Sequence, residues 1–264
     1  MSEKIIHYCW FGPKPLSKLA KKCIKSWKKF LPDYEIKLWN EDNFDFNSCA
    51  FVKQAYEKKK WAFVSDYARM KVLKEYGGIY FDTDMEITKN IDSLLQNDFF
   101  FGVEDSGMIA AGVIYAKEKN HPFITEMVKL YESFEQFETE DLFKISIPRL
   151  FTATLKEKFG LDENFDKTQI TILEKNNTKI YIYPREYFYP LSYDHQNNIY
   201  TDHTCMIHHY DATWTSRPEK IKLFFRRKNI KFMNRVVDAF VSVGIRAKRI
   251  AKKIKNVSKK EEEK

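Results

Sequence analysis

The stretch Tyr76–Asp84, with the sequence YGGIYFDTD, decides the fold that we expect for this chain. Gly77 and Gly78 indicate the end of a helix. The three apolar residues after them indicate a short buried strand. Asp82 and Asp84 follow directly. Because ligands bind beyond the carboxyl ends of strands in open α/β sheets, we expect these two carboxylates to lie at a binding edge of a sheet.

Asp82 and Asp84 are candidate metal ligands, with Thr83 between them on the same loop. Two carboxylates at this spacing can face one divalent cation, and oxygen ligands suit Mn²⁺ or Mg²⁺. Such a cation can bridge two phosphates and neutralise the charge that develops on a departing diphosphate. An Asp-x-Asp triplet is also common by chance in polar surface loops, so the surrounding sequence has to decide between the two interpretations.

Strand and helix patterns alternate on both sides of this stretch. Strands are predicted at 4–9, 34–39, 79–81, 99–104, 110–116, 170–174, 179–183 and 204–209. Helices are predicted at 16–30, 48–59, 61–76, 122–134 and 140–158. This alternation indicates an α/β sandwich with a central, mostly parallel sheet. Residues 160–203 have the least regular pattern and are expected to hold loops.

Asp66 and Arg69 place two charges on an otherwise apolar face of the predicted helix 61–76. Charges on a core face are costly unless they are paired or used. One explanation is an internal ion pair, one turn apart, that braces the helix. The other is a functional role, because the same face approaches the strand end that carries Asp82.

These segments, in this order, resemble the DXD-containing glycosyltransferases of family 32. The matching segments are Lys4–Gly12, Trp27, Pro32–Asn40, Ser65–Arg69 and Gly77–Asp84. The family includes bacterial capsular-polysaccharide and lipopolysaccharide sugar transferases and yeast-type initiating α-mannosyltransferases, and the clostridial glucosylating toxins share its core. The resemblance implies a GT-A-type nucleotide-binding sandwich. It also implies metal-dependent transfer of a sugar to an acceptor hydroxyl, with retention of the anomeric configuration.

The resemblance implies a role for each matching residue. Trp10, beside Cys9, matches the position whose ring stacks on the donor base. Asp66 and Arg69 match residues that hold the hydroxyls of the donor sugar and, for Arg69, the phosphate side. The expected catalytic residues are Asp66, Arg69, Asp82 and Asp84. The expected donor-binding residues are Cys9, Trp10, Asp66, Arg69, Gly78, Asp82, Thr83, Asp84, His208 and Trp214.

The segment Met206–Trp214, with the sequence MIHHYDATW, resembles the C-terminal Ile-His-His…Ser-Trp signature of the same family. In that family, the loop leading to the tryptophan closes over the diphosphate and excludes water. A neutral imidazole can complete the coordination of the cation, and His208 is favoured over His209. One buried and one exposed histidine is the alternative interpretation. The expected metal ligands are Asp82, Asp84 and His208.

Positive charge is confined to the C-terminal segment. The chain of 264 residues has a net charge of +8, but residues 217–257 hold 14 Lys/Arg and 2 Asp/Glu, so the preceding 216 residues are net negative. We expect a glycosyltransferase domain over 1–216 and a basic helical extension over 217–264. Apolar residues at helical spacing within 243–257 predict an amphipathic helix that binds an anionic membrane surface, or a solvated helix packed on the domain. No aromatic-basic motif supports nucleic-acid binding.

The expected location is cytoplasmic, with peripheral attachment to the cytoplasmic face of the membrane. No apolar run approaches the roughly 18 residues of a spanning helix, and the N-terminus does not resemble a signal peptide. The four cysteines form no CxxC pair, which indicates reduced thiols.

The expected reaction uses a UDP-sugar, or a GDP-sugar as second choice, and a glycan or lipid-linked glycan acceptor in bacterial capsule, lipopolysaccharide or exopolysaccharide synthesis. Two other classes are weighed against it. A metal-dependent phosphoesterase would need further carboxylate or histidine ligands around Asp82. A non-catalytic nucleotide-sugar-binding protein would be expected to lose Asp84 or Arg69, and both are present.

Overall fold

The computed structural model describes residues 4–137, 144–175, 177–211, 215, 217–230, 233, 236 and 237. The chain divides into two compact units. The first comprises 1–193 with 198–214, and the second comprises 194–197 with 215–264. The candidate site lies in the first unit, and helix α7 (Arg217–Arg227) belongs to the second.

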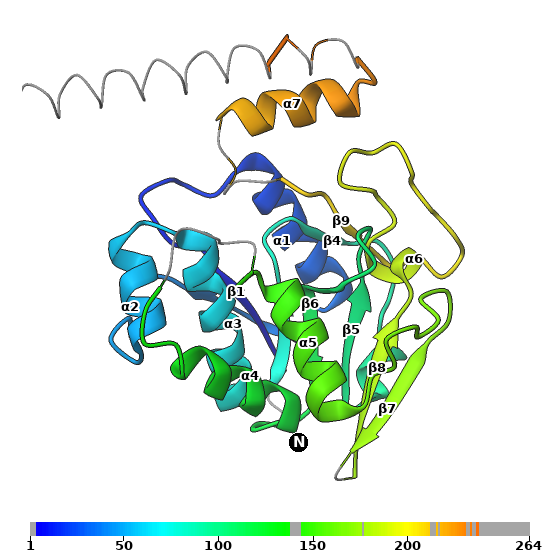
Figure 1. Ribbon diagram of the computed structural model, residues 1–264. Helices are drawn as coiled ribbons and strands as arrows, with labels where there is room; N and C mark the ends of the chain where they lie inside the picture. Colours follow the sequence, from blue (N-terminus) through cyan, green and yellow to red (C-terminus); the bar gives the residue numbers. More distant parts are fainter. Residues whose placement is uncertain are drawn as a thin grey trace, which may run out of the picture. The chain divides into compact units, whose positions relative to one another are not determined.

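The first unit is built on a seven-stranded sheet with the order β2-β1-β3-β6-β5-β8-β7 (Figure 1). Its strands are β1 (Ile5–Cys9), β2 (Glu35–Trp39), β3 (Gly78–Phe81), β5 (Phe99–Val103), β6 (Ile109–Ala116), β7 (Thr171–Lys175) and β8 (Thr178–Tyr183). The pairs β1–β2, β1–β3 and β5–β8 are parallel, and β6 and β7 pair antiparallel with their neighbours. All the strands except β6 and β7 therefore point the same way, which confirms the expected α/β fold with a mostly parallel sheet.

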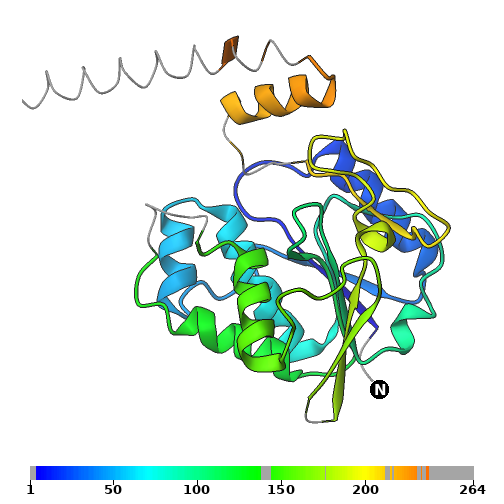
Figure 2. The same cartoon turned by 45° about the vertical axis from the view of Figure 1, so that its right-hand side comes forward.

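Helices cover both faces of this sheet. They are α1 (Lys18–Phe30), α2 (Ala50–Glu57), α3 (Trp61–Tyr76), α4 (Pro122–Glu132), α5 (Ile147–Phe159) and the short α6 (Arg185–Phe188). In the turned view the sheet stands nearly edge-on, with α1 in blue on one side and α2 to α5 in blue-cyan to green on the other (Figure 2).

Each face of the sheet has its own hydrophobic core. Side chains alternate between the faces of a strand, so Phe99 and Phe101 pack with α3 to α5 whereas Phe100 packs with the α1 side. In the same way, Tyr80 faces one core while Ile79 and Phe81 face the other. This burial on both faces explains why the central strands β3, β5 and β6 are continuous apolar runs, whereas the outer strands β2 and β7 contain charged residues.

Gly77 and Gly78 form the tight connection between α3 and β3. Both have a positive φ, 68° at Gly77 and 87° at Gly78, which favours glycine. A Cβ atom on Gly78 would lie 2.6 Å from the carbonyl oxygen of Ile5 in β1. The glycines therefore allow β3 to enter the sheet beside β1.

Several elements differ from the sequence prediction. A second, two-stranded sheet pairs β4 (Met85–Ile87) with β9 (Met206–His208), and β4 was not predicted. The helix α6 lies in the segment expected to hold loops. The predicted helix 140–158 is described only from Ile147 onward as α5. The basic amphipathic helix predicted within 243–257 lies outside the described residues. No helix in the described part of the chain is long and apolar enough to cross a membrane.

Candidate functional site

Asp82 and Asp84 lie at the carboxyl end of β3, in the turn that leads into β4. The Asp82 amide donates to the carbonyl of Gly112 in β6 (2.8 Å), and the Met85 amide donates back to the Asp82 carbonyl (3.0 Å). In the ladder of β4 with β9, Met85 pairs with His208. This register brings a histidine from more than a hundred residues away next to the aspartate pair.

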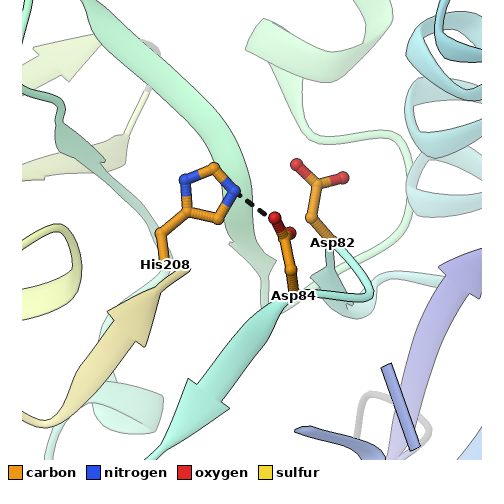
Figure 3. A group of neighbouring side chains, drawn as sticks. All are labelled: Asp82, Asp84 and His208. Carbon is orange, nitrogen blue, oxygen red and sulfur yellow. Dashed lines mark hydrogen bonds and ion pairs between the residues drawn. The ribbon is translucent and has the colours of Figure 1, made fainter. Parts of the chain in front are cut away.

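The three side chains predicted as metal ligands converge in space (Figure 3). One carboxylate oxygen of Asp82, one of Asp84 and one ring nitrogen of His208 lie within 4.8 Å of one another. His208 Nε2 is 3.1 Å from Asp84 Oδ1. Two carboxylates and an imidazole match the ligand chemistry of a divalent cation such as Mn²⁺. The described residues contain no other group of three such side chains at this spacing.

The Asp82 carboxylate is oriented by two donors. Arg69 Nη1 lies 3.1 Å from Asp82 Oδ1, and the hydroxyl of Tyr80 donates to the same oxygen at 3.0 Å. Tyr80 precedes Asp82 by two residues, so the end of the strand supplies both groups. With Oδ1 held in this way, Oδ2 is the oxygen available to a cation.

Arg69 is buried and links two carboxylates. Its Nη2 atom lies 3.0 Å from Asp66 Oδ1, and its Nη1 donates to the carbonyl of Ala111 at 2.7 Å as well as contacting Asp82. The two sequence interpretations therefore do not exclude each other, because the helix pair is also part of the aspartate loop. Burial raises the pKa of Asp66 to about 7, although the positive charge of Arg69 opposes this.

Asp84 is oriented by the segment that follows β9. Its Oδ2 accepts from the Asp211 amide (2.8 Å), and its carbonyl accepts from the His209 amide (3.0 Å). Burial alone would raise the pKa of Asp84, but His208 and the Asp211 amide outweigh it, so the pKa is lowered. Burial alone would lower the pKa of His208, but Asp84 outweighs it and raises that pKa. The Asp84–His208 contact is thus a charge-assisted hydrogen bond.

Of the remaining predicted donor-binding residues, some lie at the sheet edge that carries Asp82 and one does not. Cys9 is the last residue of β1 and Trp10 follows it; because β1 pairs parallel with β3, both lie at the same sheet edge as Asp82. Trp10 is half-buried, and its Nε1 donates to the carbonyl of Lys14 (2.6 Å), which fixes the ring. Gly78 lies at the opposite end of β3 and is not brought together with the cluster.

Burial raises the pKa of the Cys9 thiol to about 12, so Cys9 is a neutral wall of the site and not a thiolate. Trp214, expected in the closing loop, lies outside the described residues. Thr83 occupies the turn between the two aspartates.

The structure adds two residues that the sequence analysis missed. A Cβ atom on Gly112 would lie 3.4 Å from Asp82 Oδ2 and 3.3 Å from the hydroxyl of Tyr189. That hydroxyl accepts a hydrogen bond from the Val113 amide (3.0 Å), and the ring of Tyr189 packs edge-on against His208 at 5.5 Å. Neither residue belongs to a motif, so nothing in their local sequence would have singled them out.

The comparisons with known proteins agree with this geometry. Residues 17–101, which include both aspartates, match the family described as the glycosyltransferase sugar-binding region containing the DXD motif. An uncharacterised glycosyltransferase of Acanthamoeba polyphaga mimivirus is 28% identical over 251 residues, which cover 88% of this chain and 92% of the relative. The inositol phosphoceramide mannosyltransferase 3 of Schizosaccharomyces pombe is 26% identical over 133 residues, 48% of this chain and 36% of the relative.

A solved structure, the PaToxG glycosyltransferase, superposes with a TM-score of 0.50 at 24% identity, covering 61% of this chain and 72% of that one. The fold is therefore similar to that of a glycosyltransferase, and both aspartates of the candidate metal cluster lie in the segment that matches the DXD family. The match of residues 17–101 to the DXD-containing sugar-binding region confirms the resemblance drawn from the sequence.

Proposed function

We propose that this glycosyltransferase is of the family 32 type and transfers a sugar from a nucleoside-diphosphate sugar to a hydroxyl of a glycan acceptor, with retention of configuration and with bound Mn²⁺ or Mg²⁺. The observation that carries the proposal is the convergence of Asp82, Asp84 and His208 at the carboxyl end of β3. A site for one cation, beside a buried carboxylate–guanidinium pair, suits a sugar diphosphate better than a simple phosphate ester.

Different residues of the site contact the diphosphate, the sugar and the base of the donor. A divalent cation held by Asp82, Asp84 and His208 would act as a Lewis acid toward the departing diphosphate. Arg69 holds Asp82 in place and carries positive charge beside the phosphate side of the donor. Asp66 supplies a carboxylate oxygen to sugar hydroxyls, and Trp10 offers an indole face to the base. Front-face substitution and double displacement both fit this arrangement.

The experiment is a thermal-shift panel with Mn²⁺ and UDP, GDP, CMP or ADP, applied to the wild type and to Asp84→Ala. A ligand that binds only the folded state stabilises it by about 2.7 kcal/mol at a hundredfold excess over its Kd. We expect the largest Mn²⁺-dependent shift with UDP, no such shift in Asp84→Ala, and a normal shift in the control Asp33→Ala, whose side chain is 77% exposed. The absence of a shift with every nucleotide would overturn the donor site.

We also propose that the acceptor is a lipid-linked glycan of bacterial capsule, lipopolysaccharide or exopolysaccharide synthesis, and that the basic segment 217–257 holds the enzyme on an anionic membrane surface. The described part of this segment supports the idea. In α7, Ile221 and Phe224 are 47% and 56% exposed, and their spacing of three residues places them on one side of a helix rich in Lys and Arg. Such a helix can insert apolar side chains while its cations meet lipid phosphates.

Sedimentation with vesicles containing phosphatidylglycerol tests the membrane proposal. Deletion of residues 245–264, and separately Ile221→Ser with Phe224→Ser, is expected to reduce the sedimented fraction while donor hydrolysis is retained. Equal sedimentation of the variants and the full chain would contradict the proposed membrane attachment.

A further inference from the structure

A second cluster of charged and imidazole side chains lies beside the candidate metal cluster without belonging to it. Glu86 Oε2 accepts hydrogen bonds from Lys22 Nζ and from His209 Nε2, both at 2.8 Å. Glu86 and His209 are mostly buried, with side chains 18% and 22% exposed, and Lys22 is 60% exposed. The three residues come from β4, the segment after β9, and α1 respectively. Glu86 follows Asp84 by two residues, and its carboxylate bonds within this second cluster.

The position of this cluster is important because few backbone hydrogen bonds hold the strand that carries His208. The β4–β9 ladder has three residue pairs, and an isolated two-stranded ladder is only marginally stable in water. Helix α1 anchors β4 from one side. Trp27 Nε1 donates to the Met85 carbonyl (2.6 Å), and the Ser26 hydroxyl accepts from the Ile87 amide (2.9 Å).

The segment His208–Asp211 has a different set of anchors. Three of its hydrogen bonds go to Asp84, from the His208 ring, the His209 amide and the Asp211 amide. The bond of the His209 ring to Glu86 ties this segment to a carboxylate outside the metal cluster. A cation bound at the cluster would compete for the carboxylate oxygens of Asp84, which bond to the His208 ring and the Asp211 amide. The bond of the His209 amide to the Asp84 carbonyl and the bond of the His209 ring to Glu86 would remain.

We propose that His209, held by Glu86, is a positioning residue that keeps the segment His208–Asp211 in place against Asp84 and thereby raises the affinity of the metal cluster for a divalent cation. The adjacent rings of His208 and His209 bond to Asp84 and Glu86, two residues apart on one chain. Both rings must release before the segment can move away. Residues that hydrogen-bond to metal ligands and orient them change metal affinity by about 10–100-fold in known sites. The proposal rests on the proposed function in that the cluster must bind a cation.

The contribution of Lys22 is expected to be smaller. Its side chain is largely exposed, and ion pairs of exposed lysines contribute little because water and salt screen them. Lys22→Met is therefore expected to change cation affinity less than twofold, and the His209–Glu86 bond is the part of the cluster that matters.

The test is titration of the full-length protein with Mn²⁺ alone, followed by the electron paramagnetic resonance signal of free hydrated Mn²⁺. His209→Ala is expected to weaken Mn²⁺ binding about tenfold. His209→Gln, whose amide nitrogen can reach the position of Nε2, is expected to restore affinity to within about threefold, whereas the shorter His209→Asn is not. The matched control is His203→Ala, an exposed histidine whose ring stacks on Tyr187 at 5.2 Å.

The outcomes separate this proposal from the proposed function. If the wild type does not bind Mn²⁺, both the proposed metal site and the positioning role are overturned. If the wild type binds Mn²⁺ and all three His209 variants bind it equally well, the positioning role alone is overturned. Should His209→Ala fail to fold, the comparison of His209→Gln with His209→Asn tests the positioning role, and equal Mn²⁺ affinity of these two variants would overturn it. A double-mutant cycle of His209→Ala with Glu86→Ala is expected to be non-additive, and additive effects would contradict a shared role.

Discussion

Replacement of Asp66 by asparagine is expected to make the free energy of unfolding less dependent on pH. Asp66 is 7% exposed, and burial raises its pKa from 3.8 to about 7 despite the opposing effect of Arg69. Between these pH values the folded protein binds a proton that the unfolded chain has released. The stability contributed by this proton is therefore fully present below pH 3.8 and is lost as the pH rises through 7.

The magnitude follows from the two pKa values. The linkage relation gives Asp66 a contribution to the free energy of unfolding of about 3 kcal/mol at pH 5 and close to zero at pH 8. Asparagine does not titrate. The free energy of unfolding of Asp66→Asn, taken relative to wild type, is therefore expected to rise by about 3 kcal/mol between pH 5 and pH 8.

Urea unfolding with EDTA present, at pH 5 and pH 8, measures this difference. The control is Asp33→Asn, an exposed carboxylate near Lys4, for which we expect nearly the same difference from wild type at both pH values. An equally constant difference for Asp66→Asn would refute the argument that burial holds a proton on this carboxyl. The same variant is expected to lose sugar transfer, because the amide cannot replace a carboxylate toward sugar hydroxyls.

Three further predictions concern other buried groups. Arg69→Met is expected to lower the free energy of unfolding by about 3–5 kcal/mol in chemical denaturation, because it leaves two partly buried carboxylates without their cation. Burial lowers the pKa of His121 to about 3, so the folded protein does not bind a proton that the unfolded chain takes up below pH 6.5. The free energy of unfolding of the wild type therefore falls by about 2 kcal/mol from pH 7 to pH 5 because of His121, and urea unfolding of His121→Phe is expected to lack this fall. Gly78→Ala is expected to lower the melting temperature, because its Cβ would lie 2.6 Å from the Ile5 carbonyl and its φ is 87°.

Local sequence predicted the parts of the site that are close together in the chain. The turn glycines, the apolar strand and Asp82 with Asp84 lie within nine residues, and Asp66 with Arg69 is one helix away. Each has a physical cause that acts locally, such as a positive φ, alternating burial or a charge on an apolar helix face. The same rules predicted the main strands, because a sheet buried on both faces requires continuous apolar runs.

Pairing between distant segments could not be predicted in this way. Strand β4 has three residues, Met85–Ile87, and its pattern is too short to show a period. Its partner β9 is equally short, so the register that places His208 beside Asp84 depends on α1 and on the segment after β9. Gly112 is important because Asp82 and Tyr189 approach it, and this crowding exists only after β6 has paired with β3.

The two aspartates are held side by side by separate sets of hydrogen-bond donors. Like charges this close repel, and each carboxylate has its own donors to offset the repulsion. Arg69 and Tyr80 serve Asp82, and His208 with the Asp211 amide serves Asp84. The contact of Arg69 with Asp66 is sufficient to brace helix α3, and the additional contact with Asp82 is explained by the requirements of the aspartate pair. The Asp82 donors leave one oxygen open, whereas His208 must exchange its bond to Asp84 for the cation. Cation binding therefore requires an exchange of hydrogen bonds at the His208 segment, and metal affinity is expected to depend on the contacts that hold this segment.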